Sequence, residues 1–212
     1  MSFLDSIKKI FAGTKEQAEQ DQPDHRPTSP TPSAADLYAA RLEGERVEKE
    51  RFFKHSAYSP IEDRAGFSGL NYYPPNLDYR YELALQEADE PELLTFQTST
   101  GDEQTYHRLG TVEFEVEGQP AQLAVYQSTD HEGLFVPFRD ATSGEETYGA
   151  GRYLEPEALG DGKLLLDFNL AYNPYCAYSE NYSCPLPPFE NHLTRVAIRA
   201  GEKAYQKSDP AN

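Results

Sequence analysis

Two arginines in an acidic part of the chain are the groups best suited to bind an anion. Between residues 109 and 162 there are eleven acidic residues but only two basic ones, Arg139 and Arg152. Both lie in the segment LFVPFRDATSGEETYGAGRYL (134–154), whose alternating apolar residues and central Ser-Gly predict a β-hairpin. Guanidinium groups bind carboxylates and phosphates through paired hydrogen bonds, so the placement of these two side chains decides whether they form a site.

The expected register of this hairpin places the two arginines together. If the loop covers residues 141–146, Arg139 stands opposite Tyr148 and Arg152 stands opposite Phe135. Because side chains alternate along a strand, Arg139, Tyr148 and Arg152 then share one face. The opposite face collects apolar side chains suited to a core, namely Leu134, Val136, Phe138 and Tyr153.

In that register the two guanidinium groups are well separated along the strand. Four strand residues correspond to roughly 13 Å, so Arg139 and Arg152 could hold the two ends of a ligand more easily than one oxyanion. The alternative is that both arginines pair with the acidic side chains around them.

A second polar pair stands at the end of a later predicted strand. In KLLLDFN (163–169), the side chains of Asp167 and Asn169 point to the same face, roughly 7 Å apart. A carboxylate placed there could act as a general base. The alternative is that both residues anchor the backbone of the loop that follows.

That loop, DFNLAYNPYCAYSENYSCPLPPFEN (167–191), has an unusual composition. It holds both cysteines of the chain with four tyrosines, four asparagines and four prolines. Its prolines exclude a helix interior or a central strand, and its tyrosines are atypical of a disordered linker. We interpret it as an ordered cover over the sheet that walls any site, with Asn173, Cys176 and Asn191 as candidate ligand-binding residues and Glu190 as a second candidate base.

The cysteine spacing does not predict a metal site. Cys176 and Cys184 are separated by seven residues, unlike the C-x2-C pairs of common zinc sites. A nucleophilic cysteine would need a base, for which His192 is a conceivable partner. We expect reduced thiols in a cytoplasmic chain, with a Cys176–Cys184 disulfide as the main alternative. No cofactor is predicted either, since the Gly-x-Gly at 149–151 lacks the third glycine and the helix of a dinucleotide site.

The elements that would position these residues are mostly strands. From about residue 67 onward the hydrophobic pattern has a period of two, and YRYELAL, KLLLDFN and TRVAIRA predict strands, while TVEFEVEGQPAQLAVY predicts a hairpin turning near Gly118. There is no βαβ alternation. The sequence predicts a mainly β fold, an antiparallel barrel or sandwich of about eight or nine strands with an N-terminal helix packed on it.

That helix is predicted from Ser33 to about Lys54. SAAD at its start matches a weak capping box, and a thin apolar stripe places the helix on the surface. Ahead of it we expect a short amphipathic helix over residues 1–12 and a disordered, proline-rich linker over 13–32. A single β-rich domain then covers residues 33–207.

Charge and hydropathy exclude some classes of partner. The net charge of −17 argues against binding to nucleic acid or to anionic membranes. No apolar segment is long enough to span a membrane, and the N-terminal residues lack the apolar core of a signal peptide. We therefore expect a cytoplasmic protein with no integral membrane segment, of unpredicted oligomeric state.

Four blocks of the sequence resemble a known family. FSGLNYYP, the 134–154 segment, the 167–191 segment and IRAGEK are similar to the blocks of microbial proteins filed as domain of unknown function 1684. The resemblance covers Arg46 to Lys203 and implies a single domain without an agreed activity. It also implies that the following residues belong to the family pattern: Arg139, Asp140, Thr147, Tyr148, Arg152, Tyr153, Asp167, Asn169, Asn173, Cys176, Cys184, Glu190 and Asn191.

Three functions are compatible with these observations. The first is a β domain that binds a small molecule, anionic ligands included, through Arg139, Tyr148, Arg152, Asp167 and Asn169 under the 167–191 loop. The second is a hydrolase-type enzyme with Asp167 or Glu190 as base and arginines that stabilise negative charge. The third is a protein-interaction module whose aromatic loop contacts a partner.

Overall fold

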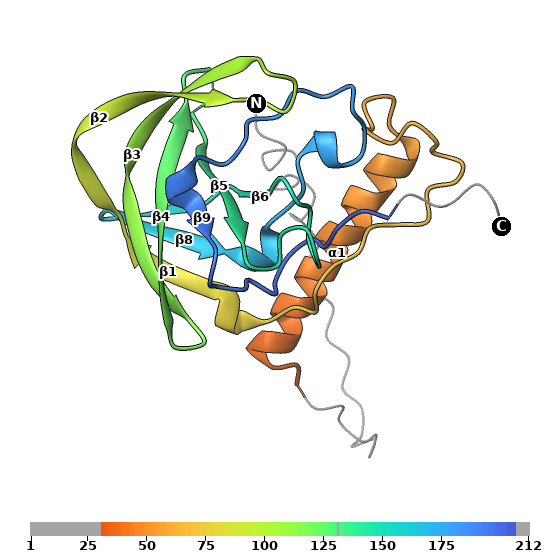
Figure 1. Cartoon of the computed structure of the whole chain (residues 1–212). Helices are drawn as coiled ribbons and strands as arrows, with labels where there is room; N and C mark the ends of the chain where they lie inside the picture. Colours follow the sequence, from red (N-terminus) through yellow and green to blue (C-terminus); the bar gives the residue numbers. More distant parts are fainter. Residues whose placement is uncertain (1–30, 131, 207–212) are drawn as a thin grey trace, which may run out of the picture. The chain divides into compact units, whose positions relative to one another are not determined.

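The alternating segments of the sequence form two β-sheets beside one long helix (Figure 1). The computed structural model describes residues 31–130 and 132–206, and those from Pro32 onward belong to one compact unit. The helix expected over residues 1–12 and nearly all of the linker expected over 13–32 lie outside the described residues.

The elements follow in a simple order. They are α1 (Ala34–His55), the 3-10 helix η2 (Leu77–Tyr79), β1 (Arg80–Ala84), β2 (Gln86–Gln97), β3 (Glu103–Val116), β4 (Gln119–Ser128), β5 (Leu134–Asp140), β6 (Arg152–Leu154), β7 (Glu157–Gly160), β8 (Lys163–Asp167), the 3-10 helices η3 (Phe168–Leu170), η4 (Tyr175–Ala177) and η5 (Phe189–Asn191), and β9 (His192–Leu193).

The strands pair into a small and a large sheet. One has the order β1-β8-β7 and the other β2-β3-β4-β5-β6, with β9 added beside β5. Every strand pair is antiparallel except β5–β9. One apolar core draws side chains from both sheets, among them Val112, Leu123, Val136, Leu164 and Leu166. The prediction of a mainly β fold is confirmed, and its arrangement is sandwich-like rather than a closed barrel.

The β3–β4 hairpin forms where the sequence predicts it. Val112, Phe114 and Val116 are buried on one face of β3. The strands join through Glu117 and Gly118, both with positive φ (50° and 79°), so the turn has the left-handed conformation that fits the strand twist.

The segment TRVAIRA does not form the predicted strand. β9 ends at Leu193, directly before this segment, and residues 196–200 belong to no described strand. The Arg152 side chain accounts for this difference. Its guanidinium donates hydrogen bonds to the carbonyls of Ile198 and Ala200, which a neighbouring strand would otherwise use for pairing.

Helix α1 begins and ends close to the predicted positions. Ser33 and Asp36 form a reciprocal capping box, with Asp36 N donating to Ser33 Oγ over 3.1 Å and Ser33 N to Asp36 Oδ2 over 2.9 Å. Within α1 only three side chains are buried, those of Leu42, Arg46 and Phe53.

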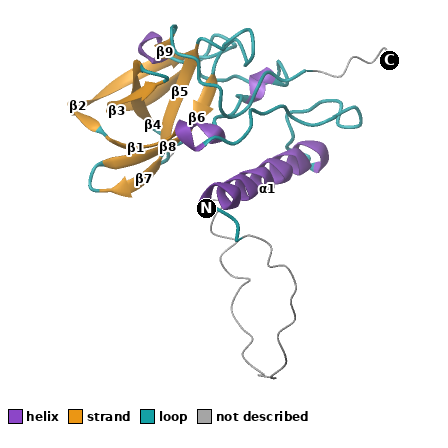
Figure 2. Cartoon of the chain, turned by 90° about the horizontal axis from the view of Figure 1, so that it is seen from below, coloured by secondary structure: helices purple, strands orange, loops and turns teal. Residues whose placement is uncertain are grey.

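The helix lies against loops rather than against a sheet. Both views place α1 beside irregular segments at one side of the sheets (Figures 1 and 2). Its Phe53 forms a second apolar cluster with Ile61, Phe67, Leu70 and Tyr178. None of the described helices is long and apolar enough to cross a membrane.

Candidate functional site

Arg139 and Arg152 lie on opposite faces of their sheet, which corrects the predicted register. Arg152 pairs with Phe138 instead of Phe135, so its side chain shares the face of Phe138 and Val136. Arg139 is exposed and pairs through its backbone with His192 of β9. The two guanidinium groups therefore do not form one site.

A longer connection than predicted causes the shift. The chain leaves β5 at Asp140 and enters β6 at Arg152, so eleven residues form the connection in place of the six assumed. Its first half is a compact turn, in which Thr142 Oγ1 donates to Asp140 Oδ1 over 2.8 Å and lies 2.9 Å from Thr147 Oγ1. Gly151 has a φ of 107° and lies against Phe138 O, where a Cβ would come within 2.6 Å.

Arg152 is a buried structural cation. Only 1% of the residue is exposed, and its guanidinium donates to the carbonyls of Ile198 (2.8 Å), Ala200 (2.5 Å) and Glu202 (3.2 Å). Asp140 Oδ2 lies 3.5 Å from Arg152 Nη2. Burial lowers the pKa of Arg152, and the Asp140 carboxylate opposes that effect. These contacts hold the C-terminal segment against the core.

Asp167 and Asn169 lie together and bind protein groups, although the predicted strand ends at Asp167 and Asn169 lies in η3. Asp167 accepts hydrogen bonds from Tyr38 Oη (2.8 Å) and from Asn169 N (3.1 Å) and Nδ2 (3.0 Å), with Arg80 Nε at 3.6 Å. Asn169 also bonds both backbone groups of Asn76. These are the contacts of an anchor that ties α1 and the 76–80 segment to the end of β8.

Glu190 and Asn191 hold the end of the 167–191 loop on the large sheet. Glu190 receives a bidentate bond from Arg108 and a 2.5 Å bond from Tyr126 Oη. The buried Asn191 side chain bonds both backbone groups of Ala124 and the carbonyl of Pro137. Both side chains therefore act as backbone or sheet anchors.

A buried carboxylate that the sequence reasoning missed lies next to Asn173. Glu202 is 1% exposed and accepts hydrogen bonds from Lys49 Nζ (2.8 Å), Asn173 N (3.0 Å) and Tyr178 Oη. The glutamate belongs to IRAGEK, one of the blocks used for the family resemblance, and this was its one signal in the sequence. It joins α1 to the tyrosine-rich loop.

Tyr148 and Cys176 are brought together by the fold. Tyr148 Oη lies 3.7 Å from Cys176 Sγ, and Cys176 N lies 3.3 Å from Cys184 Sγ. The two cysteines form no disulfide. Among the described residues there is no group of three or more His, Cys, Asp or Glu side chains arranged to hold a metal ion.

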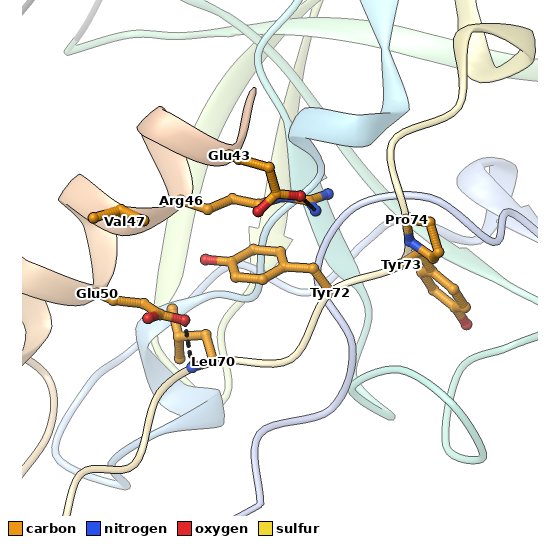
Figure 3. A pocket seen from close by; sticks show the side chains of 8 residues that line it. All are labelled: Glu43, Arg46, Val47, Glu50, Leu70, Tyr72, Tyr73 and Pro74. Atoms are coloured by element: carbon orange, nitrogen blue, oxygen red, sulfur yellow. Dashed lines mark hydrogen bonds and ion pairs between the residues drawn. The ribbon is translucent and has the colours of Figure 1, made fainter. Parts of the chain in front are cut away.

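A cleft between α1 and the 70–74 segment contains unpaired polar groups (Figure 3). It has a volume of about 360 Å³ and is lined by Glu43, Arg46, Val47, Glu50, Leu70, Tyr72, Tyr73 and Pro74. The helix side chains follow the i, i+3, i+4, i+7 spacing of one helical face. The sequence reasoning did not single out this cleft, because it depends on a contact between segments about twenty-five residues apart.

Arg46 is the central side chain of this cleft. It is 8% exposed, and its guanidinium carbon lies 4.4 Å from the centre of the Tyr72 ring. Arg46 Nη1 bonds Glu43 Oε1 over 3.0 Å, whereas Nε and Nη2 are buried without a hydrogen-bond partner in the described part of the chain. The Tyr72 hydroxyl is likewise buried and unpaired within residues 31–130 and 132–206.

The two acidic side chains of the cleft already accept hydrogen bonds from protein groups. Glu50 Oε1 accepts a hydrogen bond from Leu70 N over 2.9 Å, which fixes the 70–74 segment to the helix. Burial, followed by the negative charges of Glu202 and Glu50, raises the pKa of Tyr72, so its hydroxyl is a hydrogen-bond donor at neutral pH.

Comparisons with known proteins agree with the fold. Residues 65–203 match the family described as "Protein of unknown function (DUF1684)". The chain is also similar to the solution NMR structure of an uncharacterised protein of Haloarcula marismortui, with 41% identity over 79% of this chain and 94% of that one, and a TM-score of 0.61. No curated protein matches the chain. Since the family match covers more than half of the residues, the chain belongs to the DUF1684 family.

Proposed function

We propose that this protein binds a small molecule with an anionic group in the cleft between α1 and residues 70–74. The observation that carries the proposal is a pair of Arg46 nitrogens without a hydrogen-bond partner from any described residue, in a side chain that lines the cleft. Nε and Nη2 are the two adjacent nitrogens that bind a carboxylate or phosphate side-on through parallel hydrogen bonds, and they are the ones left unpaired.

A buried guanidinium with unpaired nitrogens destabilises the fold unless a ligand accepts its hydrogen bonds. A buried donor without a partner costs about 1–3 kcal/mol, and more for a charged group. Native structures keep few such groups, and those that persist need an explanation. The Tyr72 hydroxyl is a third unpaired donor of the same cleft, and it lies at the far end of the ring from the Arg46 guanidinium, where it could bond a second group of the ligand (Figure 3).

The other side chains of the cleft favour a ligand that also carries donors. Glu43 and Glu50 line the same space, and an anion without donors would face their carboxylates. A molecule with one anionic group and an ammonium or hydroxyl group, as in an amino acid, complements both charges. The volume of about 360 Å³ lies in the range of small-molecule sites.

Neither Arg139 nor Arg152, the arginines singled out from the sequence, lines this cleft. Asp167 and Glu190, the candidate bases of a hydrolase, are both occupied by protein donors, which favours ligand binding over hydrolysis for this domain. The cytoplasmic location expected from the sequence stays a prediction.

Calorimetric titration of the full chain tests the proposal. The probes are glycine, glutamate, lactate and inorganic phosphate, added to wild type, Arg46→Met and the control Arg41→Met. Arg41 lies on the same helix, outside the cleft lining, and pairs with the exposed Glu45, so the control changes the charge equally. We expect binding of at least one probe with a Kd below about 1 mM.

The variants separate a ligand role from a structural role of Arg46. Arg46→Met should weaken binding by about 10–100-fold through loss of a charge-assisted pair of bonds, and Tyr72→Phe by about fivefold. Without ligand, Arg46→Met should unfold at an equal or higher urea concentration because it removes unpaired donors. Affinity unchanged in Arg46→Met, or no binding of any probe, would overturn the proposal.

A further inference from the structure

The two cysteines, which the ligand cleft does not involve, lie close together. Residues 175–184 of the tyrosine-rich loop fold back so that Cys176 N donates to Cys184 Sγ over 3.3 Å. Cys176 is half-buried, and Cys184 is buried with 7% of its surface exposed. Cys176 is therefore the more exposed residue of the pair and Cys184 the more protected one.

The β2–β3 turn holds Cys184 in this position. Ser99 N donates to Cys184 O over 2.8 Å, and Cys184 N donates to Ser99 Oγ over 3.1 Å. Pro185 forms a bridge with Thr98. Both backbone groups of Cys184 are therefore fixed, while Cys176 lies in η4, a short helix of the same loop.

The Tyr148 hydroxyl lies 3.7 Å from the sulfur of Cys176. The neighbouring Cys184 thiol has the largest effect on the pKa of Cys176 and, with Tyr148 and Ser99, lowers it to about 6 against the effect of burial. The same interaction between the two cysteines, followed by burial, raises the pKa of Cys184.

This asymmetry gives the two sulfurs different chemistry at neutral pH. The lowered pKa of Cys176 favours its thiolate, the form that attacks peroxides and disulfides. The raised pKa of Cys184 favours its thiol form, as suits a residue that reacts second. The groups around Cys176 from the three elements packed there, Ser99, Tyr148 and Cys184, are neutral donors, so the thiolate is stabilised by hydrogen bonds rather than by a cation.

We propose that Cys176 and Cys184 form a peroxide-reactive site, in which Cys176 attacks and Cys184 resolves. The Cys176 thiolate attacks a hydroperoxide ROOH, the O–O bond breaks, and Cys176 sulfenic acid forms with release of RO⁻, which takes up a proton. The Cys184 thiol then attacks that sulfur, hydroxide leaves and takes the Cys184 proton as water, and a Cys176–Cys184 disulfide remains. Two electrons pass from the thiol pair to the peroxide, and an external dithiol restores the pair by exchange.

Mass spectrometry of the full chain tests the order of reaction. Reduced protein is treated with equimolar hydrogen peroxide at pH 7 and then with dimedone, which labels sulfenic acid. Wild type should lose two hydrogens per chain without a dimedone adduct. Cys184→Ser should accumulate the adduct on Cys176, and Cys176→Ser should react at least about tenfold more slowly than wild type. A dimedone adduct on Cys184, or equal oxidation rates of Cys176→Ser and wild type, would overturn the proposal.

Tyr148 is a positioning residue of this site. Alkylation of Cys176 tests the effect of its hydroxyl on the thiolate without the use of peroxide. If loss of one donor raises the pKa of Cys176 by about one unit, the thiolate fraction at pH 6 falls from about a half to about a tenth. Tyr148→Phe should then slow iodoacetamide alkylation of Cys176 about fivefold at pH 6 and much less at pH 8. A uniform change at both pH values would show a purely steric role and would contradict the assigned donor.

Discussion

Arg152 stands directly opposite Phe138 in the β5–β6 pair, with its guanidinium carbon 5.2 Å from the centre of the phenyl ring. A cation thus occupies a core position, where the Asp140 carboxylate and three carbonyls of the C-terminal segment surround it. The contact joins β5, β6 and residues 198–202, which are far apart in the sequence.

Arg152→Met should destabilise the fold by about 3–5 kcal/mol, because it leaves a buried carboxylate without its cation and three carbonyls without donors. Arg139→Met is the matched control, since Arg139 is exposed on the opposite face, and should change the free energy of unfolding by less than about 0.5 kcal/mol. Urea denaturation measures both. Similar losses for the two variants would contradict the assigned register.

The Tyr38–Asp167 hydrogen bond is predicted to fix the start of α1. Tyr38→Phe removes only the hydroxyl that donates a hydrogen bond to Asp167. The free energy of unfolding should fall by about 1 kcal/mol. Amide exchange should become faster in the first turns of α1 and stay unchanged in β3 and β4. Tyr58→Phe, at an 82% exposed tyrosine, serves as the control and should leave exchange and stability unaltered.

The Arg108–Glu190 pair should make the free energy of unfolding depend on pH in the acidic range. Burial alone raises the pKa of Glu190, but hydrogen bonds from Arg108 and Tyr126 outweigh it and lower the pKa. The stabilisation by the Glu190 carboxylate is therefore complete above the pKa of Glu190 in the unfolded chain, about 4.3. It is lost as the pH falls through the lower pKa that Glu190 has in the folded chain. Because the pair is partly exposed, screening limits its contribution to about 1 kcal/mol.

Glu190→Gln isolates this contribution. The difference in unfolding free energy between wild type and the variant should be largest near pH 7 and should approach its minimum at pH 3. An equal difference at both pH values would assign the effect to packing rather than to charge.

Gly110 permits a close approach of β2 and β3. A Cβ at this position would lie 2.2 Å from Gln86 O, at the point where the register of the β3–β4 pair also shifts. Gly110→Ala should therefore displace the Gln86 backbone and lower the thermal unfolding midpoint by several degrees. Gly133→Ala, with nothing within 4 Å of the added Cβ, should leave the midpoint within a degree or two of wild type.

Local patterns in the sequence determined the secondary structure that depends on neighbours along the chain. The capping box at Ser33, the turn near Gly118 and the alternation of Val112, Phe114 and Val116 are set by hydrogen bonds and sterics within a few residues. These features are visible in one sequence, and they sufficed to predict a mainly β fold with a capped helix. Asp167 and Asn169 also lie together, but not through strand alternation, because β8 ends at Asp167, which caps the 3-10 helix η3 that contains Asn169.

Tertiary structure alone decided the register of β5 and β6 and the identity of the sites. The 141–151 connection is held by bonds to remote partners, such as Ala141 N to Val196 O and Ala204 N to Glu146 O, so its length could not be read from turn residues. An odd-numbered shift in register moves a side chain to the other face, which buried Arg152 while Arg139 stayed on the exposed face. The contacts of Arg46 with Tyr72 and of Cys176 with Tyr148 likewise join segments whose distance in space no local pattern encodes.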